Sequence, residues 1–249
     1  MHERSTWAPI EVVNVVVTAS CGQTLDLDRL STRLENAEYF PKKFAALKVC
    51  RASPFASALV FRTGKIVCVG APSIASASSA ADWFVQQILV ALDLPSIVPE
   101  IIVRNITAHT KLVRADQCIA VTQMESLVPN LVQYEAELFP GCTFRPGMAR
   151  YVQDVNAYER VILKRIEPII TRFTFAENKA GPVVNCFHSG KAVITGVKTY
   201  AEVSSLFHAF HETFSPKYSL LLGDSSIGDS SIETMTRARE EEPQKRLRS

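Results

Sequence analysis

Two pairs of ionisable side chains are spaced closely enough to do chemistry. His208 and His211 lie three residues apart in a segment with helical periodicity, so both rings could face one metal ion. Glu135 and Glu137 could form the acid pair of a hydrolase. No constellation of cysteines or acids surrounds the histidines, and nothing else supports hydrolysis. For the histidines, packing or solvent exposure is therefore favoured over a metal site, and for the acids catalysis is not favoured.

The usual catalytic and metal-binding motifs are missing from the sequence. It contains no GxGxxG, P-loop, GxSxG or HExxH pattern and no CxxC pair. Six cysteines stand far apart, at Cys21, Cys50, Cys68, Cys118, Cys142 and Cys186. Such spacing argues against a structural zinc site and is typical of reduced, buried thiols in an intracellular protein. The sequence predicts no enzyme, no metal, no cofactor and no small-molecule substrate.

Composition limits the fold more than the function. The 249 residues are 47% hydrophobic and 21% charged, which predicts a folded chain with one medium or two small domains. Apolar runs such as residues 10–17 are too short to cross a bilayer, and no signal-peptide core follows the first residues, so a soluble intracellular protein is expected. A net charge of +2 neither indicates nor excludes a nucleic-acid partner.

The elements that must position these side chains occur twice. Three blocks recur in the same order: residues 12–18 with 102–108, residues 39–44 with 134–139, and residues 59–70 with 185–196. The offset is 91 between Asn14 and Asn105, 95 between Phe44 and Phe139, and 126 between Phe61 and Phe187. Constant order with a growing offset indicates a duplicated unit whose second copy has gained 95 − 91 = 4 residues and then 126 − 95 = 31 residues.

Each copy has the pattern of a strand, a helix, several strands and a long helix. Asp26 or Asp28 is expected to cap a helix running through Leu30, Leu34 and Ala37. Thr-Gly-Lys and Ser-Gly-Lys place glycine in tight turns between strands. The long helices are expected over residues 80–94 and 200–214. Residues 159–170, inside the late insertion, could form a short helix or a strand.

Domain boundaries follow from this repeat. We expect an N-terminal tail at 1–10, repeat 1 at 11–98 and repeat 2 at 99–220, with an insertion at about 146–180. Residues 221–249 are rich in Ser, Asp, Glu and Arg, which predicts a disordered C-terminal tail.

The repeated blocks also carry a resemblance to a known family. LDLDRLSTRLENAEYFPKKFAAL (25–47) and YEAELFPG (134–141) are its most specific pieces, followed by the paired hairpins FRTGKIVCVG (61–70) and FHSGKAVITG (187–196). Over roughly residues 12–218 the chain resembles the core of the TATA-binding protein family. Its insertion and several exchanged residues make it similar to the divergent members found in early-branching protozoa.

The resemblance implies an α+β fold of saddle type. Two pseudo-symmetric repeats would form one curved antiparallel sheet, with helices on its convex face and DNA on its concave face. Phe44 with Phe61, and Phe139 with Phe187, align with the two pairs of aromatic wedges that open base steps in the family. For one strand phenylalanine a place in the core would be the ordinary reading, and only the paired occurrence favours wedges.

Side-chain alternation along the strands also groups the predicted contact residues on one face of the sheet. Residues of equal parity along a strand share one side of a sheet, so Asn14, Val16 and Thr18 group together, as do Asn105 and Thr107. A·T pairs present only acceptors in the minor groove, to which the two asparagine amides could donate. Lys65, Lys191, Lys198 and Arg145 would contact phosphates. The full predicted DNA-binding set is Asn14, Val16, Phe44, Leu59, Phe61, Thr63, Lys65, Val67, Val69, Asn105, Thr107, Phe139, Arg145, Asn185, Phe187, Ser189, Lys191, Val193, Thr195 and Lys198.

Several positions depart from the family pattern. Val69 replaces a threonine, Thr107 a valine and Asn185 a leucine, while Pro72 and Cys50 stand at positions of basic residues. Despite these departures, the resemblance as a whole predicts a nuclear general transcription initiation factor that binds promoter DNA through the minor groove. We expect it to nucleate the preinitiation complex with relaxed TATA specificity and to depend on partner factors. The alternative is an interaction scaffold of the same fold with little DNA binding of its own.

Protein partners follow from the same comparison. Glu135, Glu137 and Leu138 match the loop that engages transcription factor IIB in the family, so a IIB-like partner is predicted there. A IIA-like protein and promoter-specific activating complexes are further expected partners. Residues 73–94 carry no Lys or Arg, and their charges are Asp82 and Asp93, which predicts an altered regulator surface on the first long helix.

Overall fold

The computed structural model describes residues 8–53, 55–152, 154–171, 173 and 181–224. The chain divides into two compact units. The first unit comprises residues 10–109 and 194–207, and the second unit comprises the remainder. The boundary between the units cuts strand β11 (Lys191–Val197) and helix α5 (Tyr200–Phe214), so each unit contains a part of both elements.

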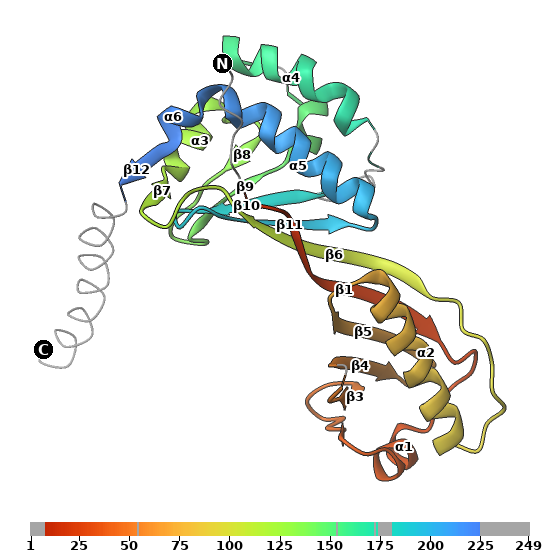
Figure 1. The fold of residues 1–249 in the computed structure, drawn as a ribbon. Helices are drawn as coiled ribbons and strands as arrows, with labels where there is room; N and C mark the ends of the chain where they lie inside the picture. The colour runs from red at the N-terminus through yellow and green to blue at the C-terminus, as the bar shows by residue number, and fades with distance from the viewer. Residues whose placement is uncertain (1–7, 54, 153, 172, 174–180, 225–249) are drawn as a thin grey trace, which may run out of the picture. The chain divides into compact units, whose positions relative to one another are not determined.

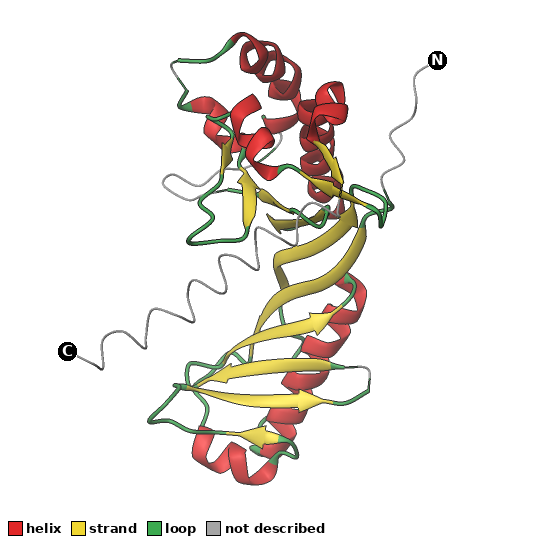
Figure 2. Ribbon diagram, turned by 90° about the vertical axis from the view of Figure 1, so that its left-hand side faces the viewer, coloured by secondary structure: helices red, strands yellow, loops and turns green. Residues whose placement is uncertain are grey.

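The first unit is an antiparallel sheet covered by helices on one face. Its strands are β1 (Glu11–Ser20), β2 (Ala37–Glu38), β3 (Ala46–Arg51), β4 (Ala56–Phe61), β5 (Lys65–Ala71) and β6 (Ile102–Lys111), hydrogen-bonded in the order β2-β3-β4-β5-β1-β6. Helix α2 (Ile74–Ala91) lies along one face of these strands, and the other face carries no helix within the unit (Figures 1 and 2). The first unit extends past the predicted repeat boundary at residue 98 because β6 pairs with β1.

Alternating burial separates the two faces of this sheet. Ala58, Val60, Ile66 and Cys68 are buried beneath α2. The residues between them are half-buried on the open face. This period of two is what a sheet covered on one side requires.

Two helices of the first unit differ in length from the prediction. Helix α1 (Leu27–Arg33) is capped by Asp26, whose carboxylate accepts from the Arg29 N–H at 3.0 Å, as expected. It ends before Ala37, because Leu34 is extended and Asn36 takes a positive φ of 55°. Helix α2 starts six residues earlier than predicted, because Ser73 and Ser76 form a capping box.

The second unit repeats the arrangement with additional helices. Its strands are β7 (Gln117–Ile119), β8 (Val132–Gln133), β9 (Gly141–Phe144), β10 (Val183–Phe187) and β12 (Leu222–Asp224), and β11-β10-β9-β8 are neighbours in the sheet. The helices are α3 (Val121–Leu127), the 3-10 turn η1 (Pro146–Arg150), α4 (Ala157–Ile170), the 3-10 turn η2 (Ser215–Lys217) and α6 (Tyr218–Leu221). Phe144 packs edge-to-face on Phe210 and Phe214, with centroids 5.6 and 5.7 Å apart.

The insertion contributes a helix that packs on α5. Residues 159–170, for which the sequence allowed either a helix or a strand, belong to helix α4. This helix begins at an Asn156–Glu159 capping box. The Tyr158 hydroxyl donates to the Thr213 carbonyl at 2.6 Å, and Arg165 pairs with Glu212 at 3.6 Å. Figure 1 shows α4 on the side of α5 that faces away from the strands.

The first residues of the expected C-terminal tail, 221–224, lie in α6 and in a strand. Leu222–Asp224 form β12, which pairs with β7 through Leu222 and Ile119, so these residues belong to the folded unit. Residues 225–249 lie outside the described part of the chain, as do residues 1–7 and 174–180. Across the described residues, no helix is both long and apolar enough to cross a bilayer.

Candidate nucleic-acid interface

Both repeats build the same hairpin turn. The Gly64 N–H donates to the Phe61 carbonyl at 2.9 Å, and the Gly190 N–H donates to the Phe187 carbonyl at 2.8 Å. Both glycines have positive φ, 84° and 75°. A Cβ on Gly64 would meet the Gln23 carbonyl oxygen at 2.1 Å, so this turn requires glycine sterically as well as conformationally. The predicted residues Thr63, Lys65, Ser189 and Lys191 lie exposed at these turns.

The predicted aromatic pairs occupy matching positions in the two units. Phe61 stands opposite Ala46 in the β3–β4 pair, and Phe187 stands opposite Gly141 in the β9–β10 pair. Phe44 and Phe139 each come two residues before that partner. The Phe139 and Phe187 rings meet edge-to-face, with centroids 5.4 Å apart.

None of the four rings belongs to the core. Phe44 is 52% exposed, and Phe61, Phe139 and Phe187 are half-buried. Phe44 and Phe139 each follow a turn that is closed by the same kind of hydrogen bond. The Phe44 N–H donates to the Phe40 carbonyl and the Phe139 N–H donates to the Glu135 carbonyl, both at 2.9 Å. The rings are thus held by ordered backbone and remain accessible.

The two asparagines make equivalent contacts in the first unit. The Asn14 Oδ1 accepts from the Gly70 N–H at 2.8 Å, and the Asn105 Oδ1 accepts from the Gly196 N–H at 2.8 Å. Both glycines have positive φ, which turns the peptide toward the asparagine. Asn14 pairs across the sheet with Thr107, and Val16 pairs with Asn105. Each amide therefore has its oxygen fixed and its nitrogen directed elsewhere.

The remaining predicted residues of the open face follow the alternation. Six of them are half-buried between buried neighbours on β1, β4, β5, β6, β10 and β11: Val16, Leu59, Val67, Thr107, Asn185 and Val193. Val69 and Thr195 are half-buried as well, but each has a buried neighbour only on its N-terminal side, because Gly70 is half-buried and Gly196 is exposed. Thr18 does not share their exposure. It is 7% exposed and accepts from Arg104 Nε at 2.8 Å, because bulges around Val16 and Val17 break the period of two.

A shallow hollow opens on the second unit beside the aromatic pair. It is lined by Gln133, Glu135, Leu138, Phe139, Gly141, Thr143, Arg145 and Asn185. The Asn185 Oδ1 accepts from the Thr143 hydroxyl at 3.0 Å, so the exchanged asparagine has a polar partner on the neighbouring strand. Arg145 lines the same hollow as Phe139 and Asn185.

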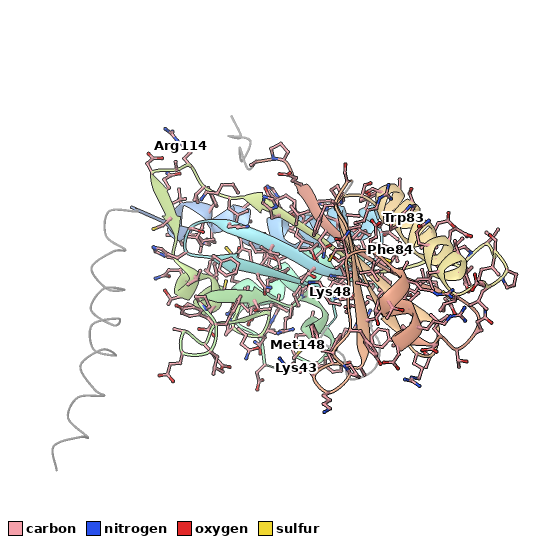
Figure 3. All side chains as sticks on the ribbon, turned by 90° about the horizontal axis from the view of Figure 1, so that it is seen from below. Lys43, Lys48, Trp83, Phe84, Arg114 and Met148 are labelled. Carbon is pink, nitrogen blue, oxygen red and sulfur yellow. The ribbon has the colours of Figure 1, made fainter. Side chains whose placement is uncertain are left out.

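Sequence reasoning missed one cation on the open face. Lys48, labelled in Figure 3, is exposed. It stands directly opposite Leu59 in the β3–β4 pair, so the register places both residues on the same face. The buried neighbours Leu47 and Val49 carry the alternation that could have identified it. Lys198 is exposed just after β11, and its N–H is bonded by the Glu202 carboxylate at 2.6 Å.

The loop predicted to bind a IIB-like protein is exposed. Leu138 is 80% exposed, and Glu135 and Glu137 are exposed beside it. The Gln133 Nε2 donates to Glu135 Oε1 at 2.6 Å and orients that carboxylate.

The other ionisable groups have structural surroundings. His208 and His211 both approach Glu212, at 3.6 and 3.8 Å, and Glu212 also pairs with Arg165. Within the described residues, no group of three or more His, Cys, Asp or Glu side chains could hold a metal. All six cysteines are free and all but Cys50 are buried; burial raises the pKa of Cys21 to about 11 and that of Cys68 to about 12.

The amino-acid sequence is similar to that of known proteins with a shared family. Residues 9–90 match the family model described as transcription factor TFIID, or TATA-binding protein. A TATA-box-binding protein of Methanococcus maripaludis is 32% identical over 82% of this chain and 93% of its own length. TATA-box-binding protein 2 of Entamoeba histolytica is 33% identical over 61% of this chain and 70% of its own length.

A solved structure agrees with the sequence comparison. The TATA-binding protein of Methanococcus jannaschii aligns with a TM-score of 0.60 and 28% identity, over 83% of this chain and 98% of that one. The fold and the comparisons define the class, a two-repeat α+β transcription factor. The chain belongs to the TATA-binding protein family. The family and fold class predicted from the sequence are thereby confirmed.

Proposed function

We propose that this protein is a nuclear general transcription initiation factor that binds promoter DNA in the minor groove. Its open sheet face would lie on the groove floor, and the pairs Phe44–Phe61 and Phe139–Phe187 would open two base steps. The TATA-binding protein is itself the known example of such wedges, whose unstacking cost of about a few kcal/mol per step is offset by contacts to bent DNA.

One observation carries this proposal: aromatic pairs stand at the same register in both repeats and are accessible to solvent. Four phenylalanines outside the core at matching positions of two repeats are unusual for a solvated surface, whereas a base step offers them a stacked apolar partner. The flanking face offers amides and small apolar groups, which suit a groove that presents acceptors at A·T pairs.

The test measures duplex affinity and bending together. The variant Phe44/Phe61/Phe139/Phe187→Ala is expected to lose DNA bending, observed as the end-to-end distance of a doubly labelled duplex. Tyr151→Ala serves as the control, because Tyr151 is 71% exposed and outside both aromatic pairs. Bending by the quadruple variant would contradict the wedge role. Absence of duplex binding by the wild type would favour the interaction scaffold.

Relaxed sequence preference is the second part of the proposal. Val69 and Asn185 replace the side chains that the family carries on this face, and both are half-buried on it. We expect the isolated protein to bind A·T-rich duplexes with a shallow preference and to depend on partner factors for placement. Nanomolar, TATA-selective binding in a panel of duplexes would contradict this part.

The proposed protein partner is a IIB-like factor at Glu135, Glu137 and Leu138. Exposed carboxylates beside an 80% exposed leucine offer a basic partner both charge and apolar contact. Glu135→Lys with Glu137→Lys is expected to weaken recovery of such a factor in a pull-down, whereas Glu100→Lys, on an exposed residue of the first unit, is not. Equal recovery by both variants would count against this partner site. IIA-like proteins and activating complexes remain proposed partners.

A further inference from the structure

Two cysteines of the second unit stand directly opposite each other on neighbouring strands. Cys142 of β9 pairs in register with Cys186 of β10, and both residues are 0% exposed. Cα atoms of opposed residues in an antiparallel pair lie about 4.5 or 5.5 Å apart, and both distances fall within the range of about 4.4–6.8 Å found in disulfides. The register therefore brings these two thiols within reach of a covalent bond.

The first repeat fills the same two positions with aliphatic side chains. The offsets of 95 and 126 that relate the aromatic pairs also relate Leu47 to Cys142 and Val60 to Cys186. Leu47 and Val60 are likewise opposed in register, and both are 0% exposed. Because an aliphatic pair fills this place in the other repeat, packing alone does not require two thiols here.

The two cysteines differ in how readily they can react. A hydrogen bond with Cys142, followed by burial and by the charge of Cys142, raises the pKa of Cys186 well above its ordinary value. A thiol with a raised pKa stays protonated, and the thiolate is the nucleophile. Reaction with an oxidant is therefore expected to begin at Cys142.

The edge of the sheet gives Cys142 a route to solvent. Strand β9 has β10 on one side and the edge strand β8 on the other. The two residues of β8 pair with Phe144 and Thr143, so within the described strands the register of β8 stops short of Cys142. A segment with few backbone hydrogen bonds opens at a lower free energy than the centre of a sheet. Local opening of β9 can thus expose Cys142 while the unit stays folded.

We propose that Cys142 and Cys186 are a site of reversible oxidation, at which hydrogen peroxide joins β9 to β10 by a disulfide bond. The Cys142 thiolate attacks one peroxide oxygen, the O–O bond breaks, and the departing hydroxide takes up the Cys142 proton as water. The resulting sulfenic acid is attacked by the Cys186 sulfur, the S–O bond breaks, and the second hydroxide leaves as water with the Cys186 proton. The two thiols lose two electrons, which reduce one peroxide to two water molecules.

The disulfide would close the part of the chain that carries the insertion. Both η1 and α4 lie between residues 142 and 186, so the bond would join the two ends of this segment. A cross-link that closes a long loop lowers the entropy of the unfolded chain. The oxidised second unit should therefore resist unfolding better than the reduced one.

The experiment treats the folded, whole chain with hydrogen peroxide, blocks the remaining thiols and maps disulfides by mass spectrometry without reduction. Trypsin is combined with a glutamate-specific protease, because Glu135 and Glu137 separate Cys118 from Cys142. A linked pair of peptides with Cys142 and Cys186 is expected, and dithiothreitol should separate it. Absence of this link, or its formation only after unfolding in denaturant, would overturn the proposal.

Two variants distinguish this pair from general thiol oxidation. Cys186→Val introduces the side chain of the first repeat and should abolish the link, and the smaller Cys186→Ala replaces it if the valine variant does not fold. Cys50→Ser removes the cysteine that is not buried and should leave the link intact. Loss of the link in Cys50→Ser would show that oxidation passes through Cys50 and would refute a direct reaction at Cys142.

Thermal unfolding measures the effect of the closed loop. Oxidation should raise the melting temperature of the wild type by about 5–10 °C, as expected for a cross-link around a long loop. The same treatment should leave the melting temperature of Cys186→Val unchanged. An equal rise in this variant, or no rise in a wild type that carries the link, would rule out stabilisation by this disulfide.

Discussion

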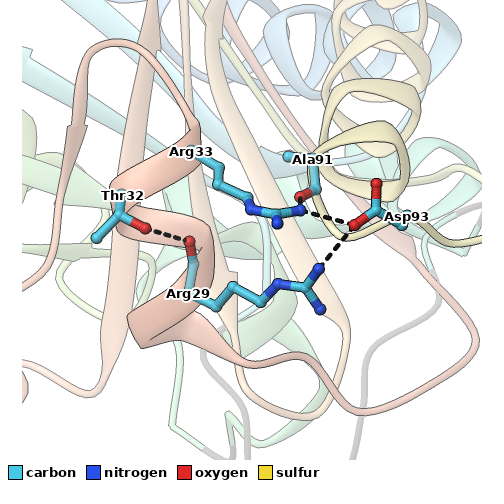
Figure 4. A network of polar contacts seen from close by, with 5 residues as sticks. All are labelled: Arg29, Thr32, Arg33, Ala91 and Asp93. Carbon is cyan, nitrogen blue, oxygen red and sulfur yellow. Dashed lines mark hydrogen bonds and ion pairs between the residues drawn. The ribbon is translucent and has the colours of Figure 1, made fainter.

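At the scale of single residues, Asp93 joins two helices of the first unit through two arginines. Its carboxylate accepts from Arg29 and from Arg33 at 2.7 Å each, and Arg33 also donates to the Ala91 carbonyl at 2.8 Å (Figure 4). The hydrogen bond from Arg33, together with the charges of both arginines, holds the pKa of Asp93 below its usual value. The end of α2 is thereby tied to α1.

This lowered pKa predicts an acid-sensitive contribution to stability. Because the folded-state pKa is depressed, the contribution is complete above the ordinary value of about 4 and is lost as pH falls through the folded value. Asp93→Asn tolerates the positive φ of 59° and removes the charge. Its melting temperature should lie slightly below that of the wild type near pH 7 and converge with it in acid. A difference that is constant across pH, or equal to that of the exposed Asp82→Asn, would contradict this role.

Gly141 is the residue that lets the Phe139 and Phe187 rings meet. A Cβ at this position would lie 2.9 Å from the Cys186 carbonyl oxygen, 3.0 Å from the Phe187 ring and 3.1 Å from the Phe139 ring. Gly141→Ala should destabilise the protein by about 1–3 kcal/mol through overpacking, measured by urea unfolding, and should reduce DNA bending. Ala46, the equivalent residue of the first repeat, already carries a Cβ, so Ala46→Gly is the matched control. Unaltered stability and bending in Gly141→Ala would show that the rings do not depend on this contact.

At the scale of elements, one buried carboxylate bonds the start of α4 to the second unit. Glu159 is 1% exposed and accepts from the Asn130 N–H at 2.9 Å, from Asn130 Nδ2 at 2.9 Å and from the Asn156 N–H at 3.2 Å. These bonds satisfy the start of α4 and the loop after α3 together. The same helix buries Ile162 and Ile166, so polar and apolar contacts fix it jointly.

Glu159→Ala is therefore expected to be among the most destabilising changes in the insertion. It leaves three donors without their acceptor, at a cost of about 3–5 kcal/mol for groups bonded to a buried charge. Chemical denaturation measures this loss. Glu167→Ala, on an exposed residue of the same helix, should change stability by less than about 0.5 kcal/mol. If both variants had the same free energy of unfolding, the Glu159 contacts would not contribute to the stability of the second unit.

The helices also show where local signals sufficed and where they did not. Helix α5 was predicted with its bounds, because its apolar period is regular from Tyr200 to Phe214. The start of α2 was missed because Ser73 and Ser76 cap it through their hydroxyls, ahead of the apolar residues that defined the prediction. The end of α1 was missed because Asn36 adopts a left-handed conformation that periodicity does not reveal.

At the scale of the whole molecule, the duplication made the sequence informative. Matched blocks located the hairpins, the aromatic pairs and both asparagines, because each required residue type occurs twice at a related spacing. Features present in one copy only were less predictable. The positions of Lys48 and of the hydroxyls around Asn105 could be known only from the cross-strand register. The burial of Thr18 depended on a bulge that the sequence does not indicate.

The net charge of only +2 means that any phosphate binding must be local. Lys65, Lys191, Lys198 and Arg145 are the proposed phosphate contacts, the three lysines exposed and Arg145 half-buried. Each contact to duplex DNA contributes about 0.9 to the slope of log affinity against log salt, through counterion release. Replacing all four with alanine should therefore reduce the slope by about 3.6.

Affinity titrations between 50 and 200 mM salt, over which a slope of about 3.6 corresponds to a roughly 150-fold change in affinity, would measure this slope. Lys164→Ala, on an exposed lysine of α4, removes one positive charge elsewhere in the second unit and should leave the slope unchanged. If both variants lowered affinity without altering the slope, the four cations would act on the fold and not on phosphates. A slope that falls only with the fourfold variant would instead support phosphate contacts by these four residues.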